Sequence, residues 1–316
     1  MDEGVGAAEA RPAAERLIRQ ERVDALSGIL NADSFMAIYE LAVAQGIPIV
    51  GANARPTALW DTGIEQVWTT SWLNPQSGRA IVPYMVEHVD GPVWAIGPDN
   101  AGGRDLLEAF TSGFTELGGE VANPDGQPTY FPFPATNNFV PYLAEIAASD
   151  AEAIYAFVAG AQAIDFVTQW AQSPAADLPV YGTGLTEGAV LQAMGGAAEG
   201  IINTHNYSPD LDNPANERFA AEWTARHDRT PTVFAVNAYD AAQVLDLAIA
   251  EIDGEVTPAA ITAAIAGVGL VDSPRGPWYF SPRTHSPVQR WYVRVVAPDG
   301  AGWSNVLLEE LPVVRD

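Results

Sequence analysis

Short apolar segments alternate with amphipathic segments of helical period along most of this chain, and this alternation constrains the fold more than any other feature. The apolar segments predict strands, and they lie at residues 23–30, 47–51, 93–96, 153–157 and 179–181. Strands that alternate with helices build mostly parallel sheets with helices on both faces. We therefore expect an α/β protein.

The length of the chain predicts two lobes. Its 316 residues exceed what one compact core usually holds, and they suffice for two lobes of roughly 100 to 200 residues each. The pattern changes late in the chain. Residues 214–251 predict two successive helices, and strand-like pairs of residues follow from Gly276. No clean internal repeat is visible.

The charge of the chain excludes several classes of protein. The formal net charge is −25, and all 15 basic residues are arginines. P-loop enzymes, protein kinases, Schiff-base enzymes and pyridoxal-phosphate enzymes need a lysine in their usual form. So acidic a surface also repels a nucleic-acid backbone, so we expect no nucleic-acid partner. No run approaches the roughly 18 to 20 apolar residues of a membrane-spanning helix, and we expect no direct membrane insertion.

Motifs of catalysis and cofactor binding are weak. Gly182, Thr183 and Gly184 follow a predicted strand as a dinucleotide-binding turn would, but the next glycine, Gly188, comes one position late. No acidic residue follows at the distance that would hold a ribose. The four histidines lack metal-binding spacing, no GxSxG elbow is present, and the chain has no cysteine. We expect no catalytic residue, metal or cofactor.

Each of several predicted strands ends in a short loop of small, amide or hydroxyl residues, at residues 31–34, 52–54, 99–103 and 183–184. In open α/β sheets, ligands bind outside the carboxyl ends of the strands, where helix N-termini also point. These loops are therefore the expected binding site. Asn100 and Thr183 are equally typical of helix N-caps, as is Ser34, and capping and ligand binding can coexist.

Four segments together indicate a family. They are GILNADS at 28–34, GIPIV at 46–50, NAYDAA at 237–242 and SPRGP at 273–277. In this order they resemble the branched-chain-amino-acid-type periplasmic binding proteins, which have the type I solute-binding fold. The resemblance spans nearly the whole chain.

The resemblance implies two Rossmann-like lobes with parallel central sheets, joined by three crossings of the chain. We expect these crossings near residues 72–75, 207–210 and 280–283. The N-terminal lobe then comprises residues 1–72 plus 207–280, and the C-terminal lobe comprises residues 73–206 plus 281–316. The family fold also has a strand and helix of about thirty residues ahead of the first strand here. We expect that unit and a signal peptide to be missing, through a late start, a shortened chain or a defective copy.

The function that the resemblance implies is the extracytoplasmic binding of a small organic molecule for an ABC importer. The lobes would close on the ligand, the permease subunits of the importer would be the partners, and the protein would be a monomer. Two alternatives stay open, a ligand-sensing domain of the same fold and an α/β enzyme with an unfamiliar site. A neighbouring permease gene favours transport, while an enzyme needs a reactive pair, for which Asp33 and Asp99 are the only candidates in these loops.

The expected ligand is not a simple α-amino acid. Amino-acid binders of this family hold the carboxylate and ammonium with hydroxyl, tyrosine and acidic side chains, and Ala54, Ala101 and Gly184 stand at three of those positions. A buried ammonium without an acidic partner costs several kcal/mol. The resemblance and the loops together give a set of candidate ligand-binding residues: Asn31, Ala32, Ser34, Asn53, Ala54, Trp72, Asn100, Ala101, Phe157, Thr183, Gly184 and Tyr207. Their amides, hydroxyls and flat rings suit an aromatic acid, an amide or an amino-acid-like compound other than a simple α-amino acid, with Arg55 as a further candidate for a carboxylate.

Overall fold

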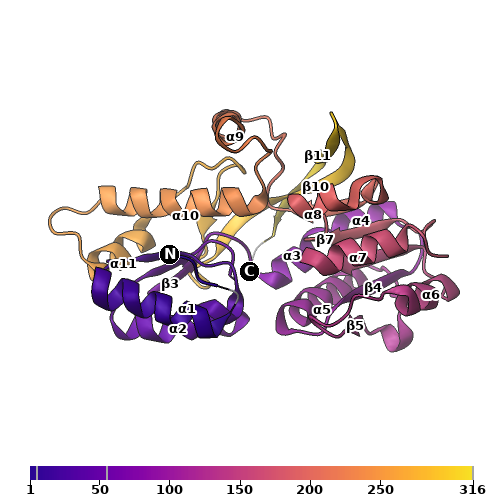
Figure 1. The fold of residues 1–316 in the computed structure, drawn as a ribbon, viewed down its shortest axis with the longest axis horizontal. Helices are drawn as coiled ribbons and strands as arrows, with labels where there is room; N and C mark the ends of the chain where they lie inside the picture. Colours follow the sequence, from indigo (N-terminus) through magenta and orange to yellow (C-terminus); the bar gives the residue numbers. More distant parts are fainter. Residues whose placement is uncertain (5, 55, 315–316) are drawn as a thin grey trace.

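The computed structural model describes residues 1–4, 6–54 and 56–314, and it has two α/β lobes that lie side by side (Figure 1). The smaller lobe is built on a three-stranded parallel sheet in the order β1-β2-β3. The larger lobe is built on an eight-stranded mixed sheet in the order β11-β10-β8-β7-β6-β4-β5, with β9 paired to β10. The predicted α/β class with two lobes is confirmed.

Both faces of the smaller sheet are covered by helices. Its strands are β1 (Leu26–Gly28), β2 (Ile49–Gly51) and β3 (Val67–Thr69), and its helices are α1 (Ala7–Arg16), α2 (Ala32–Ala44), α10 (Val233–Ala250) and α11 (Pro258–Gly267). Successive side chains of a strand point to opposite faces. Ile49 accordingly packs in the core with α1 and α2, and Val50 packs in the core with α10 and α11. Burial on both faces explains why β2 is apolar throughout.

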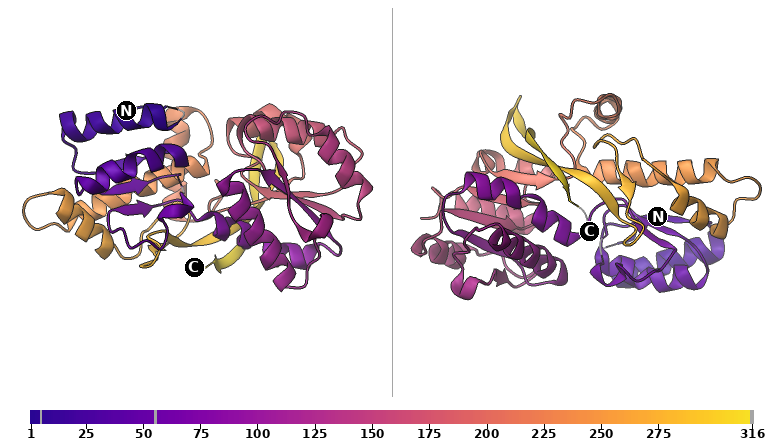
Figure 2. Two further views of the ribbon diagram at one scale, coloured as in Figure 1. Left: turned by 90° about the horizontal axis from the view of Figure 1, so that it is seen from below. Right: turned by 180° about the vertical axis from the view of Figure 1, so that it is seen from behind.

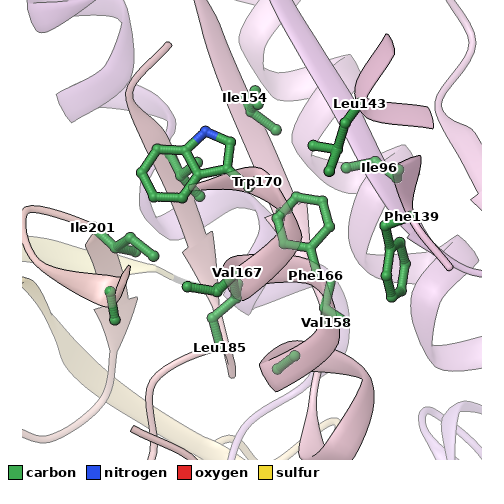
Figure 3. Close-up of a cluster of buried hydrophobic side chains, with 14 of the residues drawn as sticks. Ile96, Phe139, Leu143, Ile154, Val158, Phe166, Val167, Trp170, Leu185 and Ile201 are labelled. Carbon is green, nitrogen blue, oxygen red and sulfur yellow. The ribbon is translucent and has the colours of Figure 1, made fainter. Parts of the chain in front are cut away.

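The larger lobe holds the rest of the strands and most of the helices. Its strands are β4 (Val93–Pro98), β5 (Thr129–Phe131), β6 (Ala153–Phe157), β7 (Val180–Thr183), β8 (Ile202–His205), β10 (Pro287–Asp299) and β11 (Gly302–Val314). Its helices are α3 (Asn74–Ala80), α4 (Val82–His88), α5 (Ala101–Glu116), α6 (Val140–Ala148), α7 (Gly160–Trp170) and α8 (Ala189–Met194). Figure 3 shows one of its cores, where Phe166 and Trp170 of α7 pack over the sheet near Ile154. Helix α9 (Pro214–His227) stands apart from both sheets (Figure 1).

Several elements differ from their predicted extents. The helical period of residues 76–88 predicts a single helix. The structure has two helices there, because Pro83 lacks the N–H that a continuous helix requires and suits the first turn of a new one. The strand predicted over residues 23–30 is only β1, because Gly28 and Ile29 turn the chain with φ angles of 101° and 63°. The helical period of residues 8–20 predicts one helix, and the structure has α1 followed by a π-helical turn, Leu17–Glu21.

The third connection between the lobes is predicted near residues 280–283, and the contacts of His285 bear on its position. His285 stacks on Trp68 with ring centroids 3.8 Å apart, and its carbonyl accepts a hydrogen bond from Thr69 N at 3.0 Å. The chain therefore still lies against the smaller sheet beyond residues 280–283. Strand β10 pairs with β9 (Tyr279–Phe280) at its start and with β8 from Tyr292 onward, so the chain changes lobe within β10.

The outer edge of the larger sheet is covered by side chains. The amide of Gln192 accepts from Trp303 N at 3.2 Å and donates to Trp303 O at 2.6 Å, as a neighbouring strand would. Asp210 Oδ2 accepts from Leu307 N at 2.9 Å, and Pro312 has no N–H to offer. An uncovered edge strand is a template for pairing with another chain, and these residues block that template.

Within the described ranges, one helix, α10, is long and apolar enough to span a membrane by length and composition. Val236, Ala241 and Val244 of α10 are nevertheless almost fully buried in the protein core, as is the charged Asp240. This is the pattern of a core helix.

Candidate ligand-binding site between the lobes

The loops that follow β1 and β2 lie together at one edge of the smaller sheet. Asn53 N and Ala54 N both donate to Ile29 O, at 3.3 and 3.0 Å. Parallel strands bring their carboxyl ends to the same edge, which is where this fold class binds ligands. Both Asn53 and Ala54 are buried here.

The first turn of α2 forms one wall of this edge. Asn31 Oδ1 accepts hydrogen bonds from Asp33 N at 2.8 Å and from Ser34 N at 3.2 Å, so Asn31 caps the helix as its residue type predicts. Ala32 is exposed. Ser34 is fully buried, and its hydroxyl has no hydrogen-bond partner among the described residues. A buried hydroxyl without a partner is available to a ligand.

The loop between β1 and α2 binds a carboxylate of the chain itself. Glu3 Oε1 accepts from Leu30 N and from Asn31 N, each at 3.0 Å. Successive backbone N–H groups converge on one anion when the residues before them have left-handed φ angles, which Gly28 and Ile29 supply. Positive φ in a β-branched residue is rare, so this loop is held in an uncommon shape.

In the larger lobe, the first turn of α5 lies at the carboxyl end of β4. Asn100 caps α5 by accepting from Gly103 N at 2.8 Å, and Ala101 is exposed at the start of the helix. A Cβ atom placed on Gly102 would lie 3.1 Å from Asn74 Nδ2, so the starts of α5 and α3 are in contact. Asn74 is a buried polar residue at this edge that the sequence did not single out.

The ends of β6 and β7 complete the wall of the larger lobe. Thr183 Oγ1 donates to Thr204 O at 3.0 Å and lies 3.2 Å from Ser77 Oγ, so its hydroxyl is engaged inside the lobe. Gly184 has a φ of 74°, and a Cβ there would stand 3.4 Å from the ring of Phe157, which is half-buried. Phe157 and Gly184 therefore adjoin, as the binding prediction requires.

Trp72 and Tyr207 lie in the connections between the lobes and not in a loop wall. Both are buried, and the Trp72 ring meets His205 edge-on with centroids 4.5 Å apart. Tyr207 Oη donates to Asn216 Oδ1 at 2.8 Å, so its ring points toward α9. Burial raises the pKa of the Tyr207 hydroxyl above its ordinary value, which keeps it a neutral donor.

A hydrogen bond joins the two lobes across this site. Thr57 Oγ1, in the loop after β2, donates to Asp105 Oδ2 in the second turn of α5. The loop that carries Asn53 and the helix that Asn100 caps therefore touch, so one wall of the candidate site in each lobe meets the other. Neither partner of this contact was predicted from the sequence.

A buried polar network ties the three connections to each other. Gln289 in β10 donates from Nε2 to Ser71 O at 2.7 Å, and its Oε1 accepts from Asn206 Nδ2 at 3.1 Å. Asn206 Nδ2 also lies 3.1 Å from Asn237 Oδ1, and Asn237 Nδ2 donates to Asn53 Oδ1 at 3.2 Å. The network thus runs from the connections between the lobes to a loop of the candidate site.

One buried arginine anchors this network. Arg275 Nη1 donates to Gln289 Oε1 at 2.5 Å, and its Nε lies 2.8 Å from Asp240 Oδ2. Burial raises the pKa of Asp240 and lowers the pKa of Arg275, and the opposite charge of each partner acts against that shift. Asp240 Oδ2 also accepts from Ser273 Oγ and from Trp278 Nε1, each at 3.0 Å. The NAYDAA and SPRGP segments of the sequence supply this network.

The remaining sequence predictions concern metals, Arg55 and the two acids considered for catalysis. Across residues 1–4, 6–54 and 56–314, no three histidine, cysteine, aspartate or glutamate side chains gather so that they could hold a metal ion. Arg55 lies outside the described residues. The two acids considered for catalysis are both exposed, and Asp99 pairs with Arg104 at 2.5 Å. The ligand-binding roles assigned from the sequence stay predictions.

Two lobes with facing loops at the carboxyl ends of their strands and a connected hinge define a solute-binding protein of the type I fold. The model of the family described as periplasmic binding protein matches residues 1–301. The chain belongs to the periplasmic binding protein family.

Solved structures and curated relatives agree with this assignment. An ABC-transporter solute-binding protein of R. palustris in complex with benzoate is 31% identical, with a TM-score of 0.86 over 100% of this chain and 85% of that one. Another from R. palustris, in complex with 4-hydroxybenzoate, is 25% identical, with a TM-score of 0.88 over 99% and 85% of the chains. The Leu/Ile/Val-binding protein homolog 6 of Brucella melitensis is 28% identical over 92% of this chain and 74% of its own length.

Proposed function

We propose that this protein binds a small aromatic carboxylic acid between its lobes and delivers it to an ABC importer. The observation that carries the proposal is the carboxylate of Glu3 on Leu30 N and Asn31 N. The loop that binds this carboxylate is one of the loops expected to contact the ligand. A ligand carboxylate that displaces Glu3 would gain the same two hydrogen bonds.

The rest of the site suits an aromatic ring. Phe157 and Gly184 form a flat, mostly apolar surface where an amino-acid binder would place polar groups. The hydroxyl of Ser34 is buried and free to donate. The complexes of related solute-binding proteins with benzoate and 4-hydroxybenzoate support the same class of ligand.

We further propose an extracytoplasmic location, permease subunits as partners and the lobe division predicted from the sequence, with residues 281–288 moved to the N-terminal lobe. The family supports the location and the partners. The contacts of His285 with β3 support the changed boundary.

Calorimetric titration of the purified protein with benzoate, benzamide and leucine tests the ligand class. We expect benzoate to bind with a favourable signal and leucine to give none. Because benzamide has the same ring without the negative charge, it separates recognition of a carboxylate from recognition of an amide. Binding of leucine alone would overturn the proposal, and equal binding of benzamide would replace aromatic acids by aromatic amides.

The Glu3→Gln variant tests the carboxylate loop directly. Removing the charge of the internal carboxylate weakens its hold on Leu30 N and Asn31 N, so benzoate should bind roughly three to ten times more tightly. Glu15→Gln, which neutralises a half-buried glutamate on α1, is the matched control and should leave the affinity unchanged. If both variants bind benzoate like the parent protein, the loop does not take the ligand carboxylate.

A further inference from the structure

A cavity lies on the side of the connections that faces α9. It has a volume of about 1300 Å³, and its walls come from α8, α9, the first turns of α10 and the hairpin of β10 and β11. Helix α9 stands away from the sheets of both lobes (Figures 1 and 2). None of the candidate residues in the loops of the lobes lines it, and Tyr207 in the second connection does.

The lining of this cavity is rich in aromatic rings. Phe219 and Trp223 of α9 face it together with Tyr239 of α10 and Trp303 of β11. Phe219 and Tyr239 pack with ring centroids 5.0 Å apart, so this wall is held in place. The side chain of Trp223 is half-buried, and its Nε1 is out of contact with solvent without a hydrogen-bond partner in the described chain. A buried indole N–H normally has a partner, so Trp223 offers a donor that a ligand can satisfy.

The cavity is also less acidic than the rest of the chain. Its lining has four arginines and four acidic residues, in a protein of net charge −25. Two pairs neutralise each other, because Arg294 binds Glu187 at 2.5 Å and Arg226 lies 4.0 Å from Glu222. Arg218 and Arg229 have no ion pair within the described residues, and the guanidinium of Arg229 lies 6.0 Å from the centre of the Trp223 ring. Asp228 and Asp299 of the lining have no ion pair there either, so two cationic and two anionic groups remain beside the aromatic walls.

We propose that this cavity is a second small-molecule site, which takes a planar aromatic anion on the far side of the connections from the first site. The rings of Trp223 and Phe219 would stack on the ligand, and Arg218 and Arg229 would pair with its negative group. Typical small-molecule pockets measure about 300 to 1000 Å³, so this cavity admits a molecule of two or more rings. The site does not depend on what binds between the lobes.

Fluorescence titration with 8-anilino-1-naphthalenesulfonate tests the site, and the neutral N-phenyl-1-naphthylamine is its matched probe. We expect the sulfonate to bind more tightly than the neutral probe. The double variant Arg218→Gln/Arg229→Gln should weaken the sulfonate about tenfold and leave the neutral probe unchanged. Trp223→Leu should weaken both probes, because it removes the stacking surface.

The double variant Arg79→Gln/Arg283→Gln is the charge-matched control, since both arginines are exposed and lie outside the cavity. Equal loss of sulfonate binding in both double variants would overturn the proposal, as would binding that neither the arginine substitutions nor Trp223→Leu changes. Complete displacement of the sulfonate by benzoate, with no effect of the cavity substitutions, would place the probe between the lobes. A failure of benzoate to bind leaves this test intact, so the two proposals fail separately.

Discussion

Among the described residues, two arginines are buried, and they connect different parts of the protein although their surroundings are similar. Arg275 and Arg294 are both almost fully buried, and each pairs with one buried acid. Arg275 donates to Ser71 O in the first connection and to Gln289 Oε1 in the third. Arg294 instead stays near the larger lobe, where it donates to Asn203 Oδ1, Tyr207 O and Glu187 Oε1. The burial of an arginine therefore does not by itself tell whether the residue contributes to folding stability or to ligand binding. The elements that the arginine connects decide which of the two it affects.

The largest expected effect is on Arg294. Arg294→Met leaves Glu187 buried without its partner, which typically costs about 3 to 5 kcal/mol of unfolding free energy. Urea denaturation measures this loss. We expect the folded fraction to bind benzoate with the affinity of the parent protein.

The matched control is the double variant Arg294→Met/Glu187→Leu. Replacing a whole buried pair by apolar side chains is often close to neutral, so most of the stability should return. A tenfold loss of benzoate affinity in either variant would show that Arg294 also acts on the lobes, and the comparison would break.

The next effect concerns alkaline pH near Arg275. Tyr292 Oη donates to Arg275 O at 2.6 Å, and burial first, then the charge of Glu310, raises the pKa of Tyr292 to about 12. The folded state therefore favours the neutral hydroxyl of Tyr292. The contribution of this hydroxyl to the free energy of unfolding is complete below pH 10 and is lost as the pH rises from 10 to 12. The loss amounts to about 2 to 3 kcal/mol.

Urea denaturation of the parent protein and of Tyr292→Phe across this pH range measures the contribution. The variant should lose about 1 kcal/mol at neutral pH with the hydrogen bond, and its stability should fall less steeply above pH 10. Parallel curves for the two proteins would contradict the assignment to Tyr292.

A smaller effect on stability, but a clear one on ligand affinity, is expected at Gln289. Gln289→Met removes the hydrogen bonds to Ser71 O and Asn206, which hold the connections in the arrangement where the lobes touch. The unfolding free energy should fall by about 1 to 2 kcal/mol. Benzoate affinity should fall about tenfold, because an arrangement that binds the ligand becomes less populated.

Small-angle scattering with and without benzoate provides the second readout for this variant. Free Gln289→Met should have a larger radius of gyration than the free parent protein, and saturation with benzoate should remove the difference. Reduced stability with unchanged affinity would make Gln289 equivalent to Arg294 and erase the distinction between the two regions.

The smallest effect is expected at the contact between the lobes. Thr57→Val removes the hydroxyl that donates to Asp105, which is a single, partly buried hydrogen bond. Such a bond contributes about 0.5 to 1.5 kcal/mol, so benzoate should bind roughly two to ten times more weakly. Thr62→Val, at a hydroxyl that bonds only within its own loop, is the control and should leave the affinity unchanged.

The sequence predicted the parts of this protein that depend on local order. Periodicity located most of the strands and helices, and residue type placed Asn31 and Asn100 at helix starts, where the structure has them. The same reasoning could not orient Tyr207, because the direction of its side chain depends on Asn216 of α9 and on the buried cluster around Trp72 and Trp291. This reasoning also could not predict contacts between residues that are distant in the sequence. Examples are the contact of Thr57 with Asp105 and that of Ser71 with Gln289, a pair 218 positions apart. The last pair joins two neutral residues that no pattern of charge or hydrophobicity marks.

The covered edge of β11 has a consequence for the protein in crowded solution. When two copies meet along this edge, the groups that would join their sheets are already occupied by Gln192 and Asp210 or are absent at Pro312. These three residues therefore work against the pairing of β11 with a strand of another molecule, which is one route from folded molecules to filaments.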